Sequence, residues 1–143
     1  MLHFKKLETQ DKALIDTWFK SDELGMRLLS SYSADNFLHL IDFQKRYLWI
    51  VVSDNLPIGF FDFEIETKEK GHFSFYISPE YRGKGVGFIL LKEALKLPEI
   101  MSVEILEGGV EKDNLFSIKT LEKGGFKYVE TDEDGILMYQ LSI

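Results

Sequence analysis

Two stretches in the middle of the chain, in which apolar and polar residues alternate, constrain the fold most. The first runs from Ile58 to Glu66, and the alternation resumes from His72 to Ser78. Successive side chains of a strand point to opposite faces of a sheet, so the pattern predicts two strands joined by a turn. One face is apolar and belongs to the core. The other carries the polar side chains Asp62, Glu64, Glu66, His72, Ser74 and Tyr76.

The register of these two strands decides which polar side chains meet. A simple hairpin places Glu66 opposite His72, with Glu64 opposite Ser74 and Asp62 opposite Tyr76. A β-bulge would shift this register by one residue and exchange the two faces. The alternation alone leaves both arrangements open.

Elsewhere, the apolar spacing predicts helices and strands in mixed order. Further strands are expected at residues 2–7, 47–52, 102–106, 126–131 and 136–141, and helices at 11–20, within 23–45, after Gly85 and after Asn114. Antiparallel hairpins in this order, without a regular βαβ repeat, predict an α/β (α+β) fold. No linker, repeat or low-complexity tract interrupts residues 1–143, so we expect a single domain.

Composition narrows the class of partner. Seventeen Lys and Arg against 24 Asp and Glu give a formal net charge of −7, which argues against nucleic acid and favours a cationic partner such as an amine. The chain has no cysteine, and its three histidines show no metal-ligand spacing, so we expect no metal. It has neither a long apolar run nor an apolar secretory signal, so we expect a cytoplasmic protein with no membrane partner.

The segment Arg82-Gly83-Lys84-Gly85-Val86-Gly87 lies between the second alternating strand and a helix. Its three glycines lack Cβ atoms, so backbone N–H groups can approach a ligand closely. The start of the helix adds unpaired donors and a partial positive charge, and Arg82 and Lys84 add full charges. Together these features predict a site for phosphate or pyrophosphate.

The spacing of the segment excludes two common phosphate motifs. A P-loop requires a Gly-Lys-Ser/Thr sequence that the segment lacks. A dinucleotide-binding fingerprint requires a small residue where Phe88 stands, within a βαβ unit that the preceding hairpin does not provide.

Arg82-x-x-Gly85-x-Gly87 resembles the Arg/Gln-x-x-Gly-x-Gly/Ala signature of the GNAT superfamily of acetyl-coenzyme A-dependent N-acetyltransferases. Downstream, Asn114-x-x-Ser117-Ile118 followed by residues 122–126 (Glu-Lys-Gly-Gly-Phe) resembles that family's second motif. The resemblance implies a GNAT-like acyltransferase fold, with a mixed, mostly antiparallel central sheet flanked by about four helices.

The resemblance also implies a cofactor site for acetyl-coenzyme A. Backbone amides of the loop would hold the pyrophosphate: Arg82, Gly83, Lys84, Gly85, Val86 and Gly87. The strand would separate from its neighbour near its end, where the backbone of Phe75, Ile77 and Ser78 would pair with the pantetheine arm. Asn114 and Ser117 would contact the pantetheine region, although both residues can also serve only to cap the helix. The amine would attack the thioester directly through a tetrahedral intermediate, with a backbone N–H polarising the carbonyl.

The chain departs from the family pattern at two places. Leu121 stands where many members have a tyrosine that protonates the departing thiolate, so a tyrosine from elsewhere or a water must replace it. Gly71 and His72 stand near the position of a glutamate base, and His72 is a candidate for that role. Glu64 and Glu66, with Asp62, would bind a cationic acceptor or relay its proton. Tyr76 would line the acceptor cleft or cap the core.

The leading hypothesis is an N-acetyltransferase that acts on a primary amine of a small molecule or peptide. An exposed Phe or Trp in the N-terminal half would supply the surface of a homodimer. The alternative is a coenzyme A-binding module that has lost catalysis, which Leu121 and Gly71 favour. Turnover with a panel of amines distinguishes the two. A domain for some other phosphate ligand would require both motif matches to be accidental.

Overall fold

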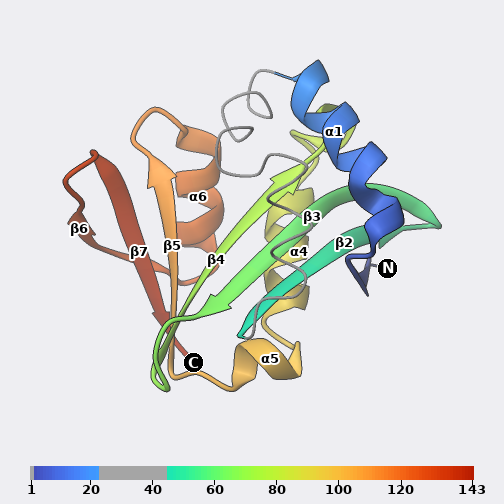
Figure 1. Cartoon of the computed structure of the whole chain (residues 1–143). Helices are drawn as coiled ribbons and strands as arrows, with labels where there is room; N and C mark the ends of the chain where they lie inside the picture. Colours follow the sequence, from blue (N-terminus) through green and yellow to red (C-terminus); the bar gives the residue numbers. More distant parts are fainter. Residues whose placement is uncertain (1, 23–44) are drawn as a thin grey trace.

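The computed structural model describes residues 2–22 and 45–143. They form a seven-stranded sheet in the order β1-β2-β3-β4-β5-β7-β6 (Figure 1). The strands are β1 Leu2–Lys6, β2 Arg46–Ser53, β3 Leu56–Ile65, β4 Lys70–Ile77, β5 Ile105–Glu111, β6 Lys127–Thr131 and β7 Ile136–Ser142. Neighbouring strands are antiparallel except β4 and β5, which are parallel. The predicted mixed, mostly antiparallel sheet is therefore confirmed.

Helices cover both faces of the sheet. The described residues contain α1 Lys12–Ser21, α4 Val86–Ala94, α5 Pro98–Met101 and α6 Leu115–Lys123, with short 3-10 helices η1 Thr9–Asp11 and η2 Pro79–Tyr81. Figure 1 shows α1 in front of β2 and β3, and α4 behind the sheet. The helix predicted within residues 23–45 falls almost wholly outside the described residues.

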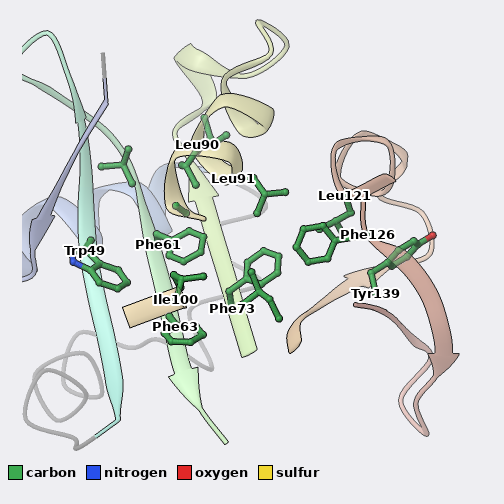
Figure 2. Close-up of a cluster of buried hydrophobic side chains, with 14 of the residues drawn as sticks. Trp49, Phe61, Phe63, Phe73, Leu90, Leu91, Ile100, Leu121, Phe126 and Tyr139 are labelled. Atoms are coloured by element: carbon green, nitrogen blue, oxygen red, sulfur yellow. The ribbon is translucent and has the colours of Figure 1, made fainter. Parts of the chain in front are cut away.

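Aromatic side chains on the apolar face of the sheet form the larger core. The rings of Phe61 and Phe73 stack with centroids 5.6 Å apart, and Phe73 meets Phe126 at 5.5 Å. Figure 2 shows this row of rings, with Leu90 and Leu91 of α4 and Leu121 of α6 packed near it. A smaller cluster lies on the opposite face, where α1 packs on β2, β3 and β4 through Ile15, Trp18, Phe19, Leu48, Ile50, Phe60 and Tyr76.

The β3–β4 hairpin has a different register from the simple one considered above. Glu64 lies opposite His72, with Asp62 opposite Ser74 and Phe60 opposite Tyr76, a shift of two residues that leaves each face unchanged. The physical reason is the place of the turn, which is centred on Lys68, one residue earlier than in the simple hairpin. The hydroxyl of Thr67 accepts hydrogen bonds from the N–H groups of Glu69 and Lys70, both at 3.1 Å.

β5 begins and ends later than the strand predicted at residues 102–106. Two glycines, Gly108 and Gly109, lie inside it and resemble a turn in the sequence. The structure needs the first of them because a Cβ atom at Gly108 would lie 2.7 Å from the ring of Phe73. Glycine thus allows β5 to approach the core here rather than ending the strand.

The described surface has two further properties that bear on the expected partners. None of the helices in residues 2–22 and 45–143 is both long and apolar enough to cross a bilayer. Trp18, Phe19 and Trp49 are buried, so they provide no homodimer surface, and the homodimer stays a prediction.

Candidate active site

The site begins where β4 and β5 separate. β4 pairs with β5 only from Lys70 to Phe73, opposite Ile105 to Gly108, and beyond that point the two strands diverge (Figure 1). A cavity of about 160 Å³ lies in the gap. It is lined by Phe73, Ser74, Phe75, Gly108, Gly109, Val110, Glu111, Asn114, Ser117 and Leu121.

Beyond Phe73, the edge of β4 that faces this cavity has no partner strand among the described residues. Ser78 N–H donates to Ile58 O at 2.8 Å and Glu66 N–H donates to Lys70 O at 3.0 Å, so even-numbered residues of β4 bond to β3. Because hydrogen bonding alternates along an antiparallel strand, the N–H and C=O groups of Phe75 and Ile77 point away from β3. The Ile77 carbonyl accepts a hydrogen bond from Arg82 Nε at 2.8 Å, so the groups that remain for a ligand are both backbone groups of Phe75 and the N–H of Ile77. An extended chain can therefore add to this edge as a strand would.

The gap ends at the glycine loop before α4. Gly83 and Gly85 have φ angles of 75° and 76°, the left-handed conformation that glycine adopts without strain. A Cβ atom at either position would touch nothing within 4 Å, so the loop is open on its outer side. Residues 82–85 form a turn, and the backbone amides of residues 83–87 lead from it into the first residues of α4. These amides lie at the N-terminus of α4, a suitable place for an anion.

The guanidinium of Arg82 does not add its charge to the open side of this loop. Its Nε donates to Ile77 O at 2.8 Å, and its two terminal nitrogens donate to the carboxylate of Asp22 at 3.0 and 2.6 Å. The same guanidinium lies 5.2 Å from the centre of the Tyr76 ring. The second cation of the loop, Lys84, is exposed. Of the two loop cations that the sequence predicts, Arg82 is therefore paired with Asp22, and Lys84 faces outward.

Asn114 and Ser117 line the opposite wall of the cavity at the start of α6. Asn114 caps this helix, and its Oδ1 accepts a hydrogen bond from the Ser117 N–H at 3.2 Å. The predicted cap is confirmed, and the same two residues border the gap.

A cluster of ionisable side chains lies at the other end of the gap. His72 Nε2 lies 2.6 Å from Glu66 Oε2, and His72 Nδ1 lies 3.0 Å from Glu107 Oε1. Glu107 is 4% exposed and accepts a hydrogen bond from Gln140 Nε2 at 2.6 Å. Hydrogen bonds from His72 and Lys70 lower the pKa of the Glu66 carboxyl. The ring is therefore held between one buried and one exposed carboxylate.

Arg46 forms ion pairs with the other two acidic residues of this face, Asp62 and Glu64. It contacts both oxygens of Asp62, at 2.9 and 2.6 Å, and Glu64 Oε2 at 3.0 Å. Asp62 is buried, while the Glu64 side chain is 47% exposed. The predicted cluster of acidic residues thus separates into an Arg46-bound pair and Glu66, which lies with His72.

Tyr76 and Ser78 are both buried. The Tyr76 hydroxyl donates a hydrogen bond to Asp22 at 2.9 Å. Burial is the larger cause of the raised pKa of Tyr76, and this hydrogen bond is the second cause. The Ser78 hydroxyl has no hydrogen-bond partner among the described residues. Of the alternatives considered for Tyr76, its position favours capping the core.

Comparison with known proteins identifies the family. The sequence profile of the Acetyltransferase (GNAT) family matches residues 13–126. The chain belongs to the GNAT family. It is 29% identical over 139 residues to Acetyltransferase PseH of Campylobacter jejuni, covering 92% of this chain and 87% of the relative. It is 26% identical over 137 residues to the N-acetyltransferase YfmK of Bacillus subtilis, covering 94% and 92%.

A solved structure shares the fold of this GNAT chain. The structure of Campylobacter jejuni N-acetyltransferase PseH in complex with acetyl coenzyme A superposes with a TM-score of 0.74, at 23% identity and covering 99% of both chains. The family assignment makes the chain an acetyl-coenzyme A-dependent acyltransferase of the N-acetyltransferase class. No group of three or more His, Cys, Asp or Glu side chains suited to a metal gathers in the described part of the chain.

The geometry explains one departure from the GNAT pattern. Gly71 is buried, and a Cβ atom there would lie 2.4 Å from the ring of Phe63. No larger residue fits at this position without moving that ring. His72, the next residue, points to the opposite face of the sheet.

Sequence reasoning missed three residues of the site. Glu107 was missed because the two glycines that follow it resemble a turn. Arg46 was missed because the apolar run that follows it indicates only a buried strand. Asp22 lies just beyond the end of α1, and nothing in the sequence relates it to Arg82.

Proposed function

We propose that this GNAT enzyme transfers the acetyl group of acetyl-coenzyme A to a primary amine of a small molecule or peptide. One observation carries the proposal. The edge of β4 that has no partner strand borders a cavity, and the chain leads from the end of this strand to open, left-handed glycines at the N-terminus of α4. This arrangement suits a ligand with an extended amide-containing arm and a pyrophosphate.

In this proposal, each part of the cofactor has its own protein partners. The amides of residues 83–87 hold the pyrophosphate, with Lys84 as its cation. The edge at Phe75 and Ile77 pairs with the pantetheine amides, while Asn114 and Ser117 form the opposite wall. The N–H of Phe75 faces the gap and polarises the thioester carbonyl.

His72 accepts the proton that the attacking amine must lose. A carboxylate only accepts hydrogen bonds, so the neutral ring keeps its proton on Nδ1, facing Glu107. Nε2 lies against Glu66 in the structure, and in this proposal it becomes free to accept a proton when the ammonium group of the acceptor takes its place beside Glu66. Glu66 lies beside Nε2 and is 48% exposed, which suits it to receive the ammonium group of the acceptor. After proton transfer, Glu66 and Glu107 both stabilise the charged ring.

The departing thiolate has no phenol beside it at Leu121. The described residues that line the cavity include no tyrosine, and their hydroxyls belong to Ser74 and Ser117. A thiol has a pKa of about 8.5, so its thiolate is an adequate leaving group, and water completes the protonation.

Thiol release from acetyl-coenzyme A, measured with a panel of primary amines, tests this function. His72→Gln should lower kcat about 10²- to 10⁴-fold, the usual contribution of a general base. His3→Gln changes an exposed histidine of β1 and should leave kcat unchanged. Full turnover by the His72→Gln variant would place the base elsewhere. Cofactor binding without thiol release for any amine would favour a binding module.

A further inference from the structure

We infer that Asp22 and Tyr76 are positioning residues that hold the pyrophosphate loop through Arg82. The inference rests on the proposed cofactor site and adds to it a role for the end of α1. It assigns the guanidinium of Arg82 to the protein and leaves the phosphate to the backbone amides and Lys84.

All three nitrogens of the Arg82 guanidinium donate a hydrogen bond within the protein. Nε is bound by Ile77 O, and the two terminal nitrogens form a bidentate pair with Asp22 at 3.0 and 2.6 Å. Such paired contacts are among the strongest that a guanidinium makes. The Asp22 side chain is 11% exposed, so water screens this pair weakly.

Tyr76 contacts both members of this ion pair. Its hydroxyl donates to Asp22 Oδ2 at 2.9 Å and lies 3.3 Å from Trp18 O, which shares the same proton. The guanidinium of Arg82 lies 5.2 Å from the centre of the Tyr76 ring. The Tyr76 side chain is itself fixed in the smaller core, stacked on Phe60 with centroids 5.6 Å apart. The carboxylate of Asp22 is thus held from two sides.

These contacts fix the loop at its first residue. The far end of the loop is Gly87, which is a buried residue of α4. A Cβ atom at Gly87 would lie 3.3 Å from Ile77 Cδ1, so the backbone packs closely against β4 here. Gly83 and Gly85 lie between these two points, and their outer sides contact nothing. A loop of glycines that is held at both ends avoids much of the entropy cost of ordering on binding.

The position of Asp22 supports this role independently. It is the C-terminal cap residue of α1, where the helix dipole disfavours a carboxylate. Arg82 offsets that cost, so the ion pair couples α1, the helix packed on the polar face of the sheet, to the cofactor loop.

The test measures the dissociation constant of coenzyme A by calorimetry for Asp22→Asn, Arg82→Gln and the double variant. Each single change should weaken binding about five- to tenfold, because the ligand must then order the loop. The double variant should bind as weakly as either single variant, since the two residues act as one unit. With acetyl-coenzyme A, KM should rise while kcat stays within about twofold.

Asp11→Asn is the matched control. Asp11 stands at the start of α1, where its carboxylate accepts a hydrogen bond from Glu8 N–H at 2.8 Å, far along the helix from Arg82. This variant should lower the melting temperature and leave the dissociation constant unchanged. A small loss of affinity in Tyr76→Phe, which keeps the ring but not the hydroxyl, would further support the inference.

Two results would overturn the inference. If Asp22→Asn bound coenzyme A more tightly, the released guanidinium would be a direct phosphate ligand. If Asp22→Asn bound as well as the unchanged protein, the contact would have no effect on the loop. Failure of the unchanged protein to bind coenzyme A would instead contradict the proposed cofactor site itself.

Discussion

His72 and Glu107 face each other across β4 and β5, one residue pair before the ladder between these strands ends. The two residues are register partners, and His72 Nδ1 lies 3.0 Å from Glu107 Oε1. The next pair, Phe73 and Gly108, is the last of the parallel ladder. The contact therefore orients the imidazole at the mouth of the gap where the acetyl group is proposed to lie.

Glu107→Gln should lower kcat about 10- to 100-fold, the usual effect of removing a carboxylate that orients a functional histidine. Coenzyme A affinity should stay unchanged, because Glu107 lies at the far end of the gap from the glycine loop. Steady-state kinetics with calorimetry separates the two effects. Loss of affinity without loss of kcat would show that Glu107 supports only the sheet.

Glu66 should make stability depend on pH in the acid range. Its pKa is lowered from the ordinary value of 4.5, so the folded state favours the ionised carboxyl. Its contribution to stability is present above pH 4.5 and is lost as the pH falls through the lowered pKa. Urea unfolding of the unchanged protein and Glu66→Gln should thus give free energies that converge as the pH falls. A constant difference across this range would contradict the shift.

Gly71→Ala should destabilise the fold by about 1–3 kcal/mol, the usual cost of overpacking a core. The added Cβ atom would lie 2.4 Å from Phe63 Cε1. Phe63→Leu removes the ring and should reduce the additional cost of the alanine. Denaturant unfolding of both single variants and the double variant measures this coupling, and strictly additive losses would contradict the account.

Ser78→Ala should raise stability by about 1 kcal/mol, since it removes a buried hydroxyl that has no partner among the described residues. Ser78 is 1% exposed, so coenzyme A binding should not change. Thermal unfolding with and without ligand provides both readouts. Weaker binding in Ser78→Ala would mean that the hydroxyl becomes accessible to the cofactor.

The sequence predicted most of the fold because its signals are local. Alternating residues on β3 and β4 identify the apolar face, and Asn114 marks the start of α6 by its capping side chain. The register of the hairpin was not predictable from the alternation alone. It depends on the place of the turn, where the Thr67 hydroxyl accepts hydrogen bonds from two backbone amides.

The sequence predicted the proposed cofactor loop better than the environment of His72. The glycines of the loop show a backbone requirement directly, and those at positions 83 and 85 do adopt positive φ angles. The partners of His72 and Arg82 are tertiary contacts. Glu107 arrives through the parallel pairing of β5, and Asp22 lies 60 residues from Arg82 in the chain. No local pattern encodes such pairs.

Thermal unfolding during a titration with acetyl-coenzyme A tests the central claim most directly. Ligand at 100 times its dissociation constant should add about 2.7 kcal/mol and raise the melting temperature by several degrees. Gly85→Val should lose this rise, because it fills the open side of the loop. Gly135→Val is the matched control, since Gly135 also has a positive φ and open space but lies in the β6–β7 turn. Gly135→Val should have a lower melting temperature without ligand and should still show the rise in melting temperature on adding acetyl-coenzyme A. No rise in the unchanged protein, or an equal rise in Gly85→Val, would contradict the account.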